Sequence, residues 1–410
     1  MAALPVRAAS IEDMLAGFAS LEQHTRQPLP PDQRVVLAIA KGLIAAYAGL
    51  VRPLRRGPLA RLRDDLAQLT SNTIELPEAP SPTSGTHYLS SEERARFASD
   101  GMLAPFPVLT PDEAAAHAAR ARAAFSEDFG GHLVFDDDVA ETLKRHDQWS
   151  INYAGLFQGQ HLPAFRALLR RPAIAHRLAS LLGPDVICWR TQFFEKGPGA
   201  PGTFWHQNSS FKESSAARKL TPTAPYSLAT IQLTVWVALT DVTVANGAMR
   251  MLPGTFVDGR LERVYEYGQA HGLDLASRIP AARRDTFLRA ALFSSGNFVK
   301  AQAVFECVQD LFGLQETWRD KPVHDLVMPA GHAVIFSSLN LHGSYGNTTD
   351  ENTRLAFVGR CCASSVRVYA DMEEDVIPTP EGPKTFPTSR TACFVVHGED
   401  RHGHNRMLRE

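Results

Sequence analysis

The stretch that decides the fold lies at residues 186–194 and reads Val186-Ile187-Cys188-Trp189-Arg190-Thr191-Gln192-Phe193-Phe194. β-branched and aromatic residues dominate it, which is the composition of a buried or half-buried strand. Two stretches further along the chain have the same character, Thr230–Leu239 and His332–Phe336. Turn-forming residues separate them, at Gly197-Pro198-Gly199 and Asn246-Gly247. This part of the chain therefore predicts a sandwich of short β-strands.

Helical signals precede the strands. Two helix starts are marked by a hydroxyl residue with acids in the first turn, Ser91-Glu92-Glu93 and Thr110-Pro111-Asp112-Glu113. Residues Arg166–Leu182 predict a further helix, which Gly183-Pro184 would end. Between Val257 and Met328 the pattern returns to helix, so we expect a helical insertion at about 257–328. The predicted architecture is mainly β, with helices packed on the strands.

Three regions follow along the chain. Residues 1–76 are rich in Ala, Leu and Arg and predict an N-terminal helical segment. Prolines, with Ser, Thr and Gly, make residues 77–87 a linker, and residues 88–410 form the large domain. The apolar run Val35–Val51 is interrupted by Lys41 and is shorter than the ~20 residues that a spanning helix needs. A helix facing a protein core, and not a membrane span, is expected there.

Composition narrows the function classes. The 410-residue chain has a net charge of −2, with 44% hydrophobic and 21% charged residues, which is ordinary for a globular protein and lacks the basic excess of nucleic-acid binders. The five cysteines are odd in number and show no CxxC spacing, so neither a disulfide framework nor a zinc knuckle is expected. The first residues, MAALPVRAAS, lack the pattern of a signal peptide. A reduced, cytoplasmic setting fits these features.

Two segments contain the residues with the most informative chemistry, Thr203-Phe204-Trp205-His206-Gln207-Asn208 and Leu341-His342-Gly343-Ser344-Tyr345. Alone, each is weak, because the chain has 15 histidines and most histidines are packed or exposed without a special role. Together with Arg354, their histidines indicate a specific chemistry. Two neutral imidazoles suit Fe(II) in a facial triad with open positions for 2-oxoglutarate and O₂. The planar fork of an arginine suits the far carboxylate of 2-oxoglutarate.

In this order, the segments resemble the phytanoyl-CoA dioxygenase group of iron and 2-oxoglutarate oxygenases. More closely, they resemble the chlorinating enzymes of non-ribosomal peptide pathways, of the syringomycin type. The resemblance runs from about Tyr88 to the C-terminus. Its motifs are Leu182-Gly183-Pro184, Cys188-Trp189-Arg190-Thr191, Phe193-Phe194, Trp205-His206-Gln207, Thr234-Val235-Trp236, Ala245-Asn246-Gly247 and Pro253-Gly254-Thr255.

The resemblance implies a double-stranded β-helix, a jelly-roll or cupin-like core decorated with α-helices. It also implies Fe(II), 2-oxoglutarate and O₂ as cofactor and co-substrates. On this basis His206 and His342 are expected to bind iron, and Arg354 to bind the distal carboxylate of 2-oxoglutarate. The other roles that it implies belong to residues around the metal: Thr234 and Trp236 would line the co-substrate pocket, Phe194 and Phe211 would lie near the substrate, and Arg360 would lie just outside the ligands.

Asn208 is the point where the sequence departs from the family pattern. Hydroxylating members have an aspartate at this third ligand position, and chlorinating members have alanine or glycine, which leaves room for halide. Three hypotheses stay open for Asn208: weak coordination that supports hydroxylation, a side chain turned aside to admit chloride, or an impaired site. Fe(II), two neutral histidines and the 2-oxoglutarate dianion sum to zero charge, which favours an added anion. The size of asparagine argues against it.

The expected function is oxidation of an aliphatic C–H bond, by hydroxylation or chlorination, in secondary metabolism. By resemblance, the substrate is a small amino-acid-like molecule, free or tethered to a carrier protein. The alternative from another class is a catalytically silent protein that binds metal and 2-oxoglutarate. No nucleic-acid partner is expected. Formation of succinate from 2-oxoglutarate would separate the two hypotheses.

Overall fold

A computed structural model describes residues 76–78, 87–125, 132–146, 149–200, 202–206, 219–223, 230–255, 322–379 and 381–409. These residues lie in one compact unit, which spans residues 71–262 and 322–410. The predicted N-terminal segment up to residue 75, most of the linker and most of the insertion lie outside the described residues. The end of the expected insertion is described, and it contains strand β7 (His324–Leu326).

The main sheet is antiparallel, with six strands in the order β1-β8-β5-β10-β2-β14. Its strands are β1 (Phe106–Pro107), β8 (His332–Ser337), β5 (Leu233–Ala238), β10 (Arg354–Ala363), β2 (Val186–Lys196) and β14 (Phe394–His397). The stretch from which the sequence analysis began is thus β2, and the other two predicted strands are β5 and β8. All three strand predictions are confirmed.

A second antiparallel sheet has the order β3-β9-β6-β7. It consists of β3 (Thr203–His206), β9 (Leu341–Ser344) and β6 (Met249–Leu252), with β7 at one edge. Two smaller two-stranded sheets complete the described strands, β11 (Val366–Val368) with β4 (Leu220–Pro222), and β12 (Glu374–Thr379) with β13 (Gly382–Pro387).

Alternation along β5 shows how one strand supports two cores. Leu233, Val235 and Val237 pack toward the helices. The intervening Trp236 and Ala238 belong to a second core, which also contains Met249 and Met251 of the second sheet. Successive residues of a strand point to opposite faces, so one face of the main sheet is its inner face, turned toward the second sheet. The prediction of a mainly β, jelly-roll-like core decorated with helices is confirmed.

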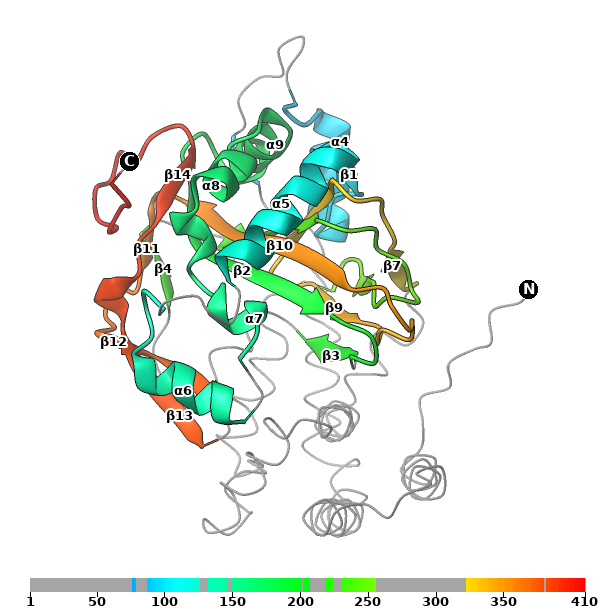
Figure 1. The fold of residues 1–410 in the computed structure, drawn as a ribbon. Helices are drawn as coiled ribbons and strands as arrows, with labels where there is room; N and C mark the ends of the chain where they lie inside the picture. The colour runs from blue at the N-terminus through cyan, green and yellow to red at the C-terminus, as the bar shows by residue number, and fades with distance from the viewer. Residues whose placement is uncertain are drawn as a thin grey trace, which may run out of the picture. The chain divides into compact units, whose positions relative to one another are not determined.

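Helices cover the outer face of the main sheet, as Figure 1 shows for α5, α8 and α9. The helices of this layer are α4 (Ser91–Asp100), α5 (Pro111–Ala124), α8 (Pro163–Leu169) and α9 (Pro172–Leu182). Thr110 caps α5 in a capping box with Glu113, as predicted. For α4 the cap is Ser90, one residue before the predicted start, because Ser90 pairs with Glu93.

The single helix expected at 166–182 is wrong in one respect. Two helices occupy this range, and the chain breaks at Arg170 and Arg171. Arg171 has an extended ψ of 136° before Pro172, which starts α9. The residue before a proline is disfavoured in the helical region, so Pro172 breaks the helix. The predicted end at Gly183 is confirmed.

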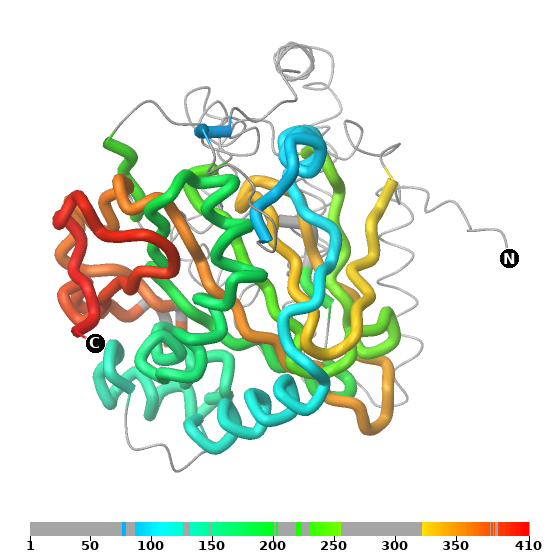
Figure 2. Tube along the Cα trace, turned by 90° about the horizontal axis from the view of Figure 1, so that it is seen from above, coloured from blue at the N-terminus to red at the C-terminus, as the bar shows by residue number. Residues whose placement is uncertain are grey.

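The remaining described helices are α6 (Asp137–Arg145), α7 (Ile151–Ala154), η1 (Gly159–His161) and η4 (Thr388–Arg390). Two of them contact β2 (α7 and η1), and two contact β12 (α6 and η4). Figure 2 shows the C-terminal residues beside the segment that contains β11 and β12. Asn405 ties them together, since it bonds the backbone of Val366 and Val368. Among the described residues, four cysteines are buried and unpaired, and no helix is long and apolar enough to cross a membrane.

Candidate active site

The two histidines that the sequence singled out occupy directly opposed positions. His206 ends β3, and its Cα partner on β9 is His342. In an antiparallel pair, directly opposed residues are ~4.5–5.5 Å apart at Cα, and the register of this pair shifts between Thr203 and His206. Residues 136 apart in the sequence are therefore brought together by one strand pairing. At the other end of this pairing, the Ser344 hydroxyl donates to Thr203 Oγ1 at 3.0 Å.

His342 is buried and oriented by its own chain. Its side chain is 5% exposed, and its Nδ1 lies 2.8 Å from the carbonyl oxygen of Asn340. A carbonyl only accepts, so Nδ1 carries the proton and the lone pair lies on Nε2. The ring meets Phe336 edge to face, with centroids 5.0 Å apart. This tautomer, held by a backbone carbonyl, leaves Nε2 as the ring nitrogen with the lone pair that a metal could use.

Arg354 begins β10 on the inner face. Its side chain is 4% exposed, and Nη1 donates to the Gly247 carbonyl at 2.8 Å. The guanidinium lies over the Trp236 ring, 5.4 Å from its centroid. Its Nε is buried without a hydrogen-bond partner, and burial lowers the pKa of Arg354 to about 10. A buried cation with an unused donor is suited to an anionic ligand.

A second cation, Lys196, lies directly opposite Arg354 in the β2–β10 pairing. Its Nζ donates to Ser344 Oγ at 2.9 Å and to the Tyr345 carbonyl at 2.8 Å. Burial, and then the neighbouring Arg354, lowers the pKa of Lys196 to about 7. Lys196 is not among the residues predicted from the sequence. The available signal was a lysine at the end of a stretch that otherwise predicts a buried strand.

Gly247 makes this arrangement possible. It has a φ of +92°, and a Cβ there would lie 2.4 Å from Lys196 Cδ and 3.0 Å from the Tyr345 carbonyl oxygen. A larger residue would therefore displace the lysine and strain the turn. The Asn246-Gly247 turn signal in the sequence thus marks a position where backbone, lysine and Arg354 meet.

Other predicted residues share the inner face of the main sheet. Thr234 and Trp236 lie on β5 and are 2% exposed, and Phe194 on β2 packs against the inner core. Arg360 lies on β10 and donates from Nη1 to Thr234 Oγ1 at 3.0 Å. Burial, and then Arg190, lowers the pKa of Arg360 to about 9.

The strand register shows how these residues are ordered along the inner face. Thr234 lies opposite both Arg360 and Phe336, and Phe336 touches the His342 ring. Arg354 is six positions from Arg360 on β10, roughly 20 Å along a strand. The two arginines thus belong to opposite ends of the inner face. The structure brings seven predicted residues to this region of β3, β9 and the inner face, while Asn208 and Phe211 lie outside the described residues.

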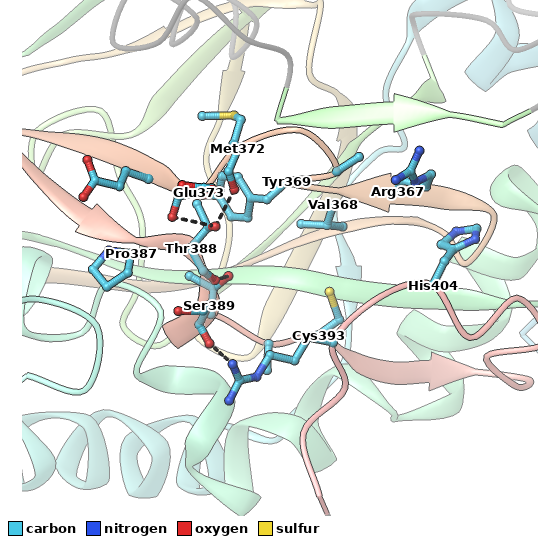
Figure 3. Close-up of a pocket in the computed structure, with 15 residues that line it drawn as sticks. Arg367, Val368, Tyr369, Met372, Glu373, Pro387, Thr388, Ser389, Cys393 and His404 are labelled. Atoms are coloured by element: carbon cyan, nitrogen blue, oxygen red, sulfur yellow. Dashed lines mark hydrogen bonds between the residues drawn. The ribbon is translucent and has the colours of Figure 1, made fainter.

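A surface pocket of about 640 Å³ lies elsewhere, between the β11–β12 loop, η4 and the C-terminal residues (Figure 3). Arg367, Tyr369, Glu373 and His404 are among its lining residues, and none of the predicted site residues is. Arg367 and Arg406 line this pocket together with Glu373 and Glu374, and His404 is the one histidine among its lining residues. The inner face of the main sheet, where the predicted residues lie, is therefore the candidate active site.

Comparison with known proteins identifies the family and supports the fold. The model of the family described as "Phytanoyl-CoA dioxygenase (PhyH)" matches residues 97–356. The solved structure titled "CytC3 with Fe(II) and alpha-ketoglutarate" is 22% identical, with a TM-score of 0.52, and the match covers 79% of this chain and 94% of that chain. A structure titled "CytC3" matches at the same identity and coverage, with a TM-score of 0.50. These likenesses concern the fold, and no curated protein matches the chain.

Proposed function

We propose that this chain, which belongs to the phytanoyl-CoA dioxygenase family, uses Fe(II) and 2-oxoglutarate to functionalise an aliphatic C–H bond of a small amino-acid-like substrate. The supporting observation is the pairing of His206 with His342 at one register position. Arg354 lies at the start of β10, on the inner face of the main sheet. An oxygenase of this kind needs a site for the metal and a cation for the distal carboxylate of 2-oxoglutarate.

The residues present fit the metal and the co-substrate. His342 presents Nε2 as its basic nitrogen because Nδ1 is bonded to Asn340. Arg354 retains a buried, unpaired Nε, which suits the distal carboxylate of 2-oxoglutarate. When bound, Fe(II) with 2-oxoglutarate supplies the oxidising chemistry with O₂.

The chain itself positions and shields the reactants. Arg354 and Lys196 would hold the distal carboxylate at the start of β10. Trp236 would keep the Arg354 guanidinium in place through contact with it. Thr234 and Phe336 would form the wall beside His342. The apolar inner core, with Met251, Val334 and Val358, would exclude bulk water from the reaction.

Chlorination and hydroxylation stay alternatives at Asn208. A neutral amide leaves the metal site one negative charge short of a site with aspartate, which favours halide. Its volume favours coordination and hydroxylation. The relation to the syringomycin-type enzymes, and a carrier-tethered substrate, belong to this proposal as its finer hypotheses.

The test is turnover of 2-oxoglutarate by the full chain with Fe(II) and O₂. We expect succinate to form, and to form faster when a suitable amino-acid-like substrate is present. His342→Ala is the negative control, because it removes a proposed metal ligand. If the wild-type chain binds Fe(II) and 2-oxoglutarate but forms no succinate with any substrate in a broad panel, the catalytically silent alternative replaces this proposal.

A further inference from the structure

Arg190 and Arg360 form a pair of like charges on the inner face of the main sheet. They are direct partners in the β2–β10 pairing, and Thr234 is the partner of Arg360 on the other side. Like charges directly opposed across two strands are destabilising when nothing lies between them. This pair lies toward the end of β10 away from Arg354. Thr234, the partner of Arg360, is also paired with Phe336, and the Phe336 ring contacts the His342 ring.

A β-bulge sets the position of Arg190. The β2–β10 register shifts between Arg360 and Cys361, so Trp189 is the extra residue on β2. Bulges re-aim a side chain and occur beside active sites. Here the bulge leaves Arg190 opposite Arg360, with its guanidinium carbon 5.1 Å from the centre of the Phe157 ring.

Both guanidinium groups retain unused donors. Among the described residues, Arg360 donates one side-chain hydrogen bond, to Thr234, and Arg190 donates none. The Nε atom of Arg190 is buried and has no partner. No carboxylate in the described part of the chain forms an ion pair with either arginine. Gln192, the next inner-facing residue of β2, is neutral.

The nearby carboxylate of Asp375 is already bound. It accepts from Lys219 Nζ at 2.7 Å, from the Tyr369 hydroxyl at 2.9 Å and from the backbone of Val376. Three cations, Arg190, Arg360 and Lys219, thus share one carboxylate, that of Asp375. The net charge of this group is about +2. Burial lowers the pKa of Arg190, and Tyr369 and Asp375 only partly oppose this.

We propose that Arg190 and Arg360 form an anion-binding site for a free carboxylate of the primary substrate, at the side of the metal away from Arg354. Two planar forks on neighbouring strands match the two oxygens of a carboxylate. A carboxyl group joined to a carrier as a thioester is neutral and would not balance the pair. The substrate class is therefore a free acid, or a molecule with an acidic side chain. The identity of the anion as substrate rests on the proposed function.

The experiment compares acids with their neutral amides on the full chain. The probes are L-leucine and benzoate, with L-leucinamide and benzamide as matched controls, and binding is followed by ligand-observed NMR and by the midpoint of thermal unfolding. We expect the acids to bind and raise the midpoint, and the amides to do neither. Equal behaviour of acids and amides, or full reproduction of the effect by chloride alone, overturns the proposal.

Variants connect the effect to the pair. Arg190→Gln should weaken acid binding about ten- to hundredfold, the value of a charged hydrogen bond. Without a probe its unfolding midpoint should equal or exceed that of wild type, because one of two like charges is gone. Arg190→Lys keeps the charge and should retain part of the binding. Arg120→Gln, on the exposed face of α5, is the control for loss of an arginine and should bind as wild type does. Unchanged acid binding in Arg190→Gln contradicts the inference.

Titration of 2-oxoglutarate separates this inference from the proposed function. Wild-type chain that fails to bind 2-oxoglutarate, yet distinguishes acids from amides through Arg190, would refute the proposed function and support the anion site. Wild-type chain that binds and consumes 2-oxoglutarate, but shows no preference for acids, would refute only the anion site.

Discussion

Replacement of Arg354 by methionine should remove 2-oxoglutarate binding while leaving the fold nearly as stable as before. Burial lowers the Arg354 pKa from 12.5 to about 10, which corresponds to roughly 3 kcal/mol of desolvation at 1.36 kcal/mol per unit. Methionine relieves that cost. It also leaves the Gly247 carbonyl without its donor, which costs about 1–3 kcal/mol. The two effects nearly cancel in the free energy of unfolding.

Affinity should change far more than stability. In the complex, methionine would leave the distal carboxylate of 2-oxoglutarate without its main partner, a loss of about 3–5 kcal/mol, which is roughly 150-fold to several thousandfold in Kd. Arg354→Lys keeps the charge but loses the fork, so we expect an intermediate Kd. Anaerobic titration calorimetry with the Fe(II)-loaded chain measures the Kd, and urea unfolding measures stability. A Kd for 2-oxoglutarate within threefold of wild type in Arg354→Met would refute the assignment of this arginine.

Three further predictions concern the metal, the third ligand position and pH. His206→Ala or His342→Ala should weaken Fe(II) binding by at least about a hundredfold, judged by anaerobic titration with a competing chelator, and retained affinity would exclude that residue as a ligand. Asn208→Asp should abolish any chloride effect on the anaerobic spectrum of the Fe(II)–2-oxoglutarate complex, whereas Asn208→Gly should enlarge it; the same response in all three forms would show that Asn208 does not control halide access. Between pH 7 and pH 10.5 the unfolded chain holds a proton on Lys196 that the folded chain has lost, so this group makes the free energy of unfolding rise with pH, by up to about 1.4 kcal/mol per pH unit. Lys196→Met should remove that rise in urea unfolding series, and an unchanged slope would contradict the lowered pKa.

The strands were predictable because their composition and their burial agree. β2, β5 and β8 are rich in β-branched and aromatic residues, and they lie in the middle of the main sheet with both faces covered. The break between α8 and α9 was missed because helical spacing continues across Arg170 and Arg171. Pro172 was the signal that should have limited the prediction.

The site was predictable only in part. His206, His342 and Arg354 could be selected because their chemistry and order form a recognisable set. Sequence cannot give the register that places Arg190 against Arg360, because one bulge residue, Trp189, decides it. Nor does it show that Lys196 lies opposite Arg354, since that pairing joins strands far apart in the chain.

The position of β3 at the edge of the second sheet has a consequence for iron loading. β3 pairs with β9 through two register positions, Thr203 with Ser344 and His206 with His342, and β9 is its only strand partner among the described residues. A metal bound by His206 and His342 would cross-link β3 to β9 and stabilise this short pairing. Iron loading should therefore slow the exchange of backbone amide hydrogens in β3 with deuterated solvent. The amides of β5 and β10, which have strand partners on both sides, should exchange at the same rate with or without iron.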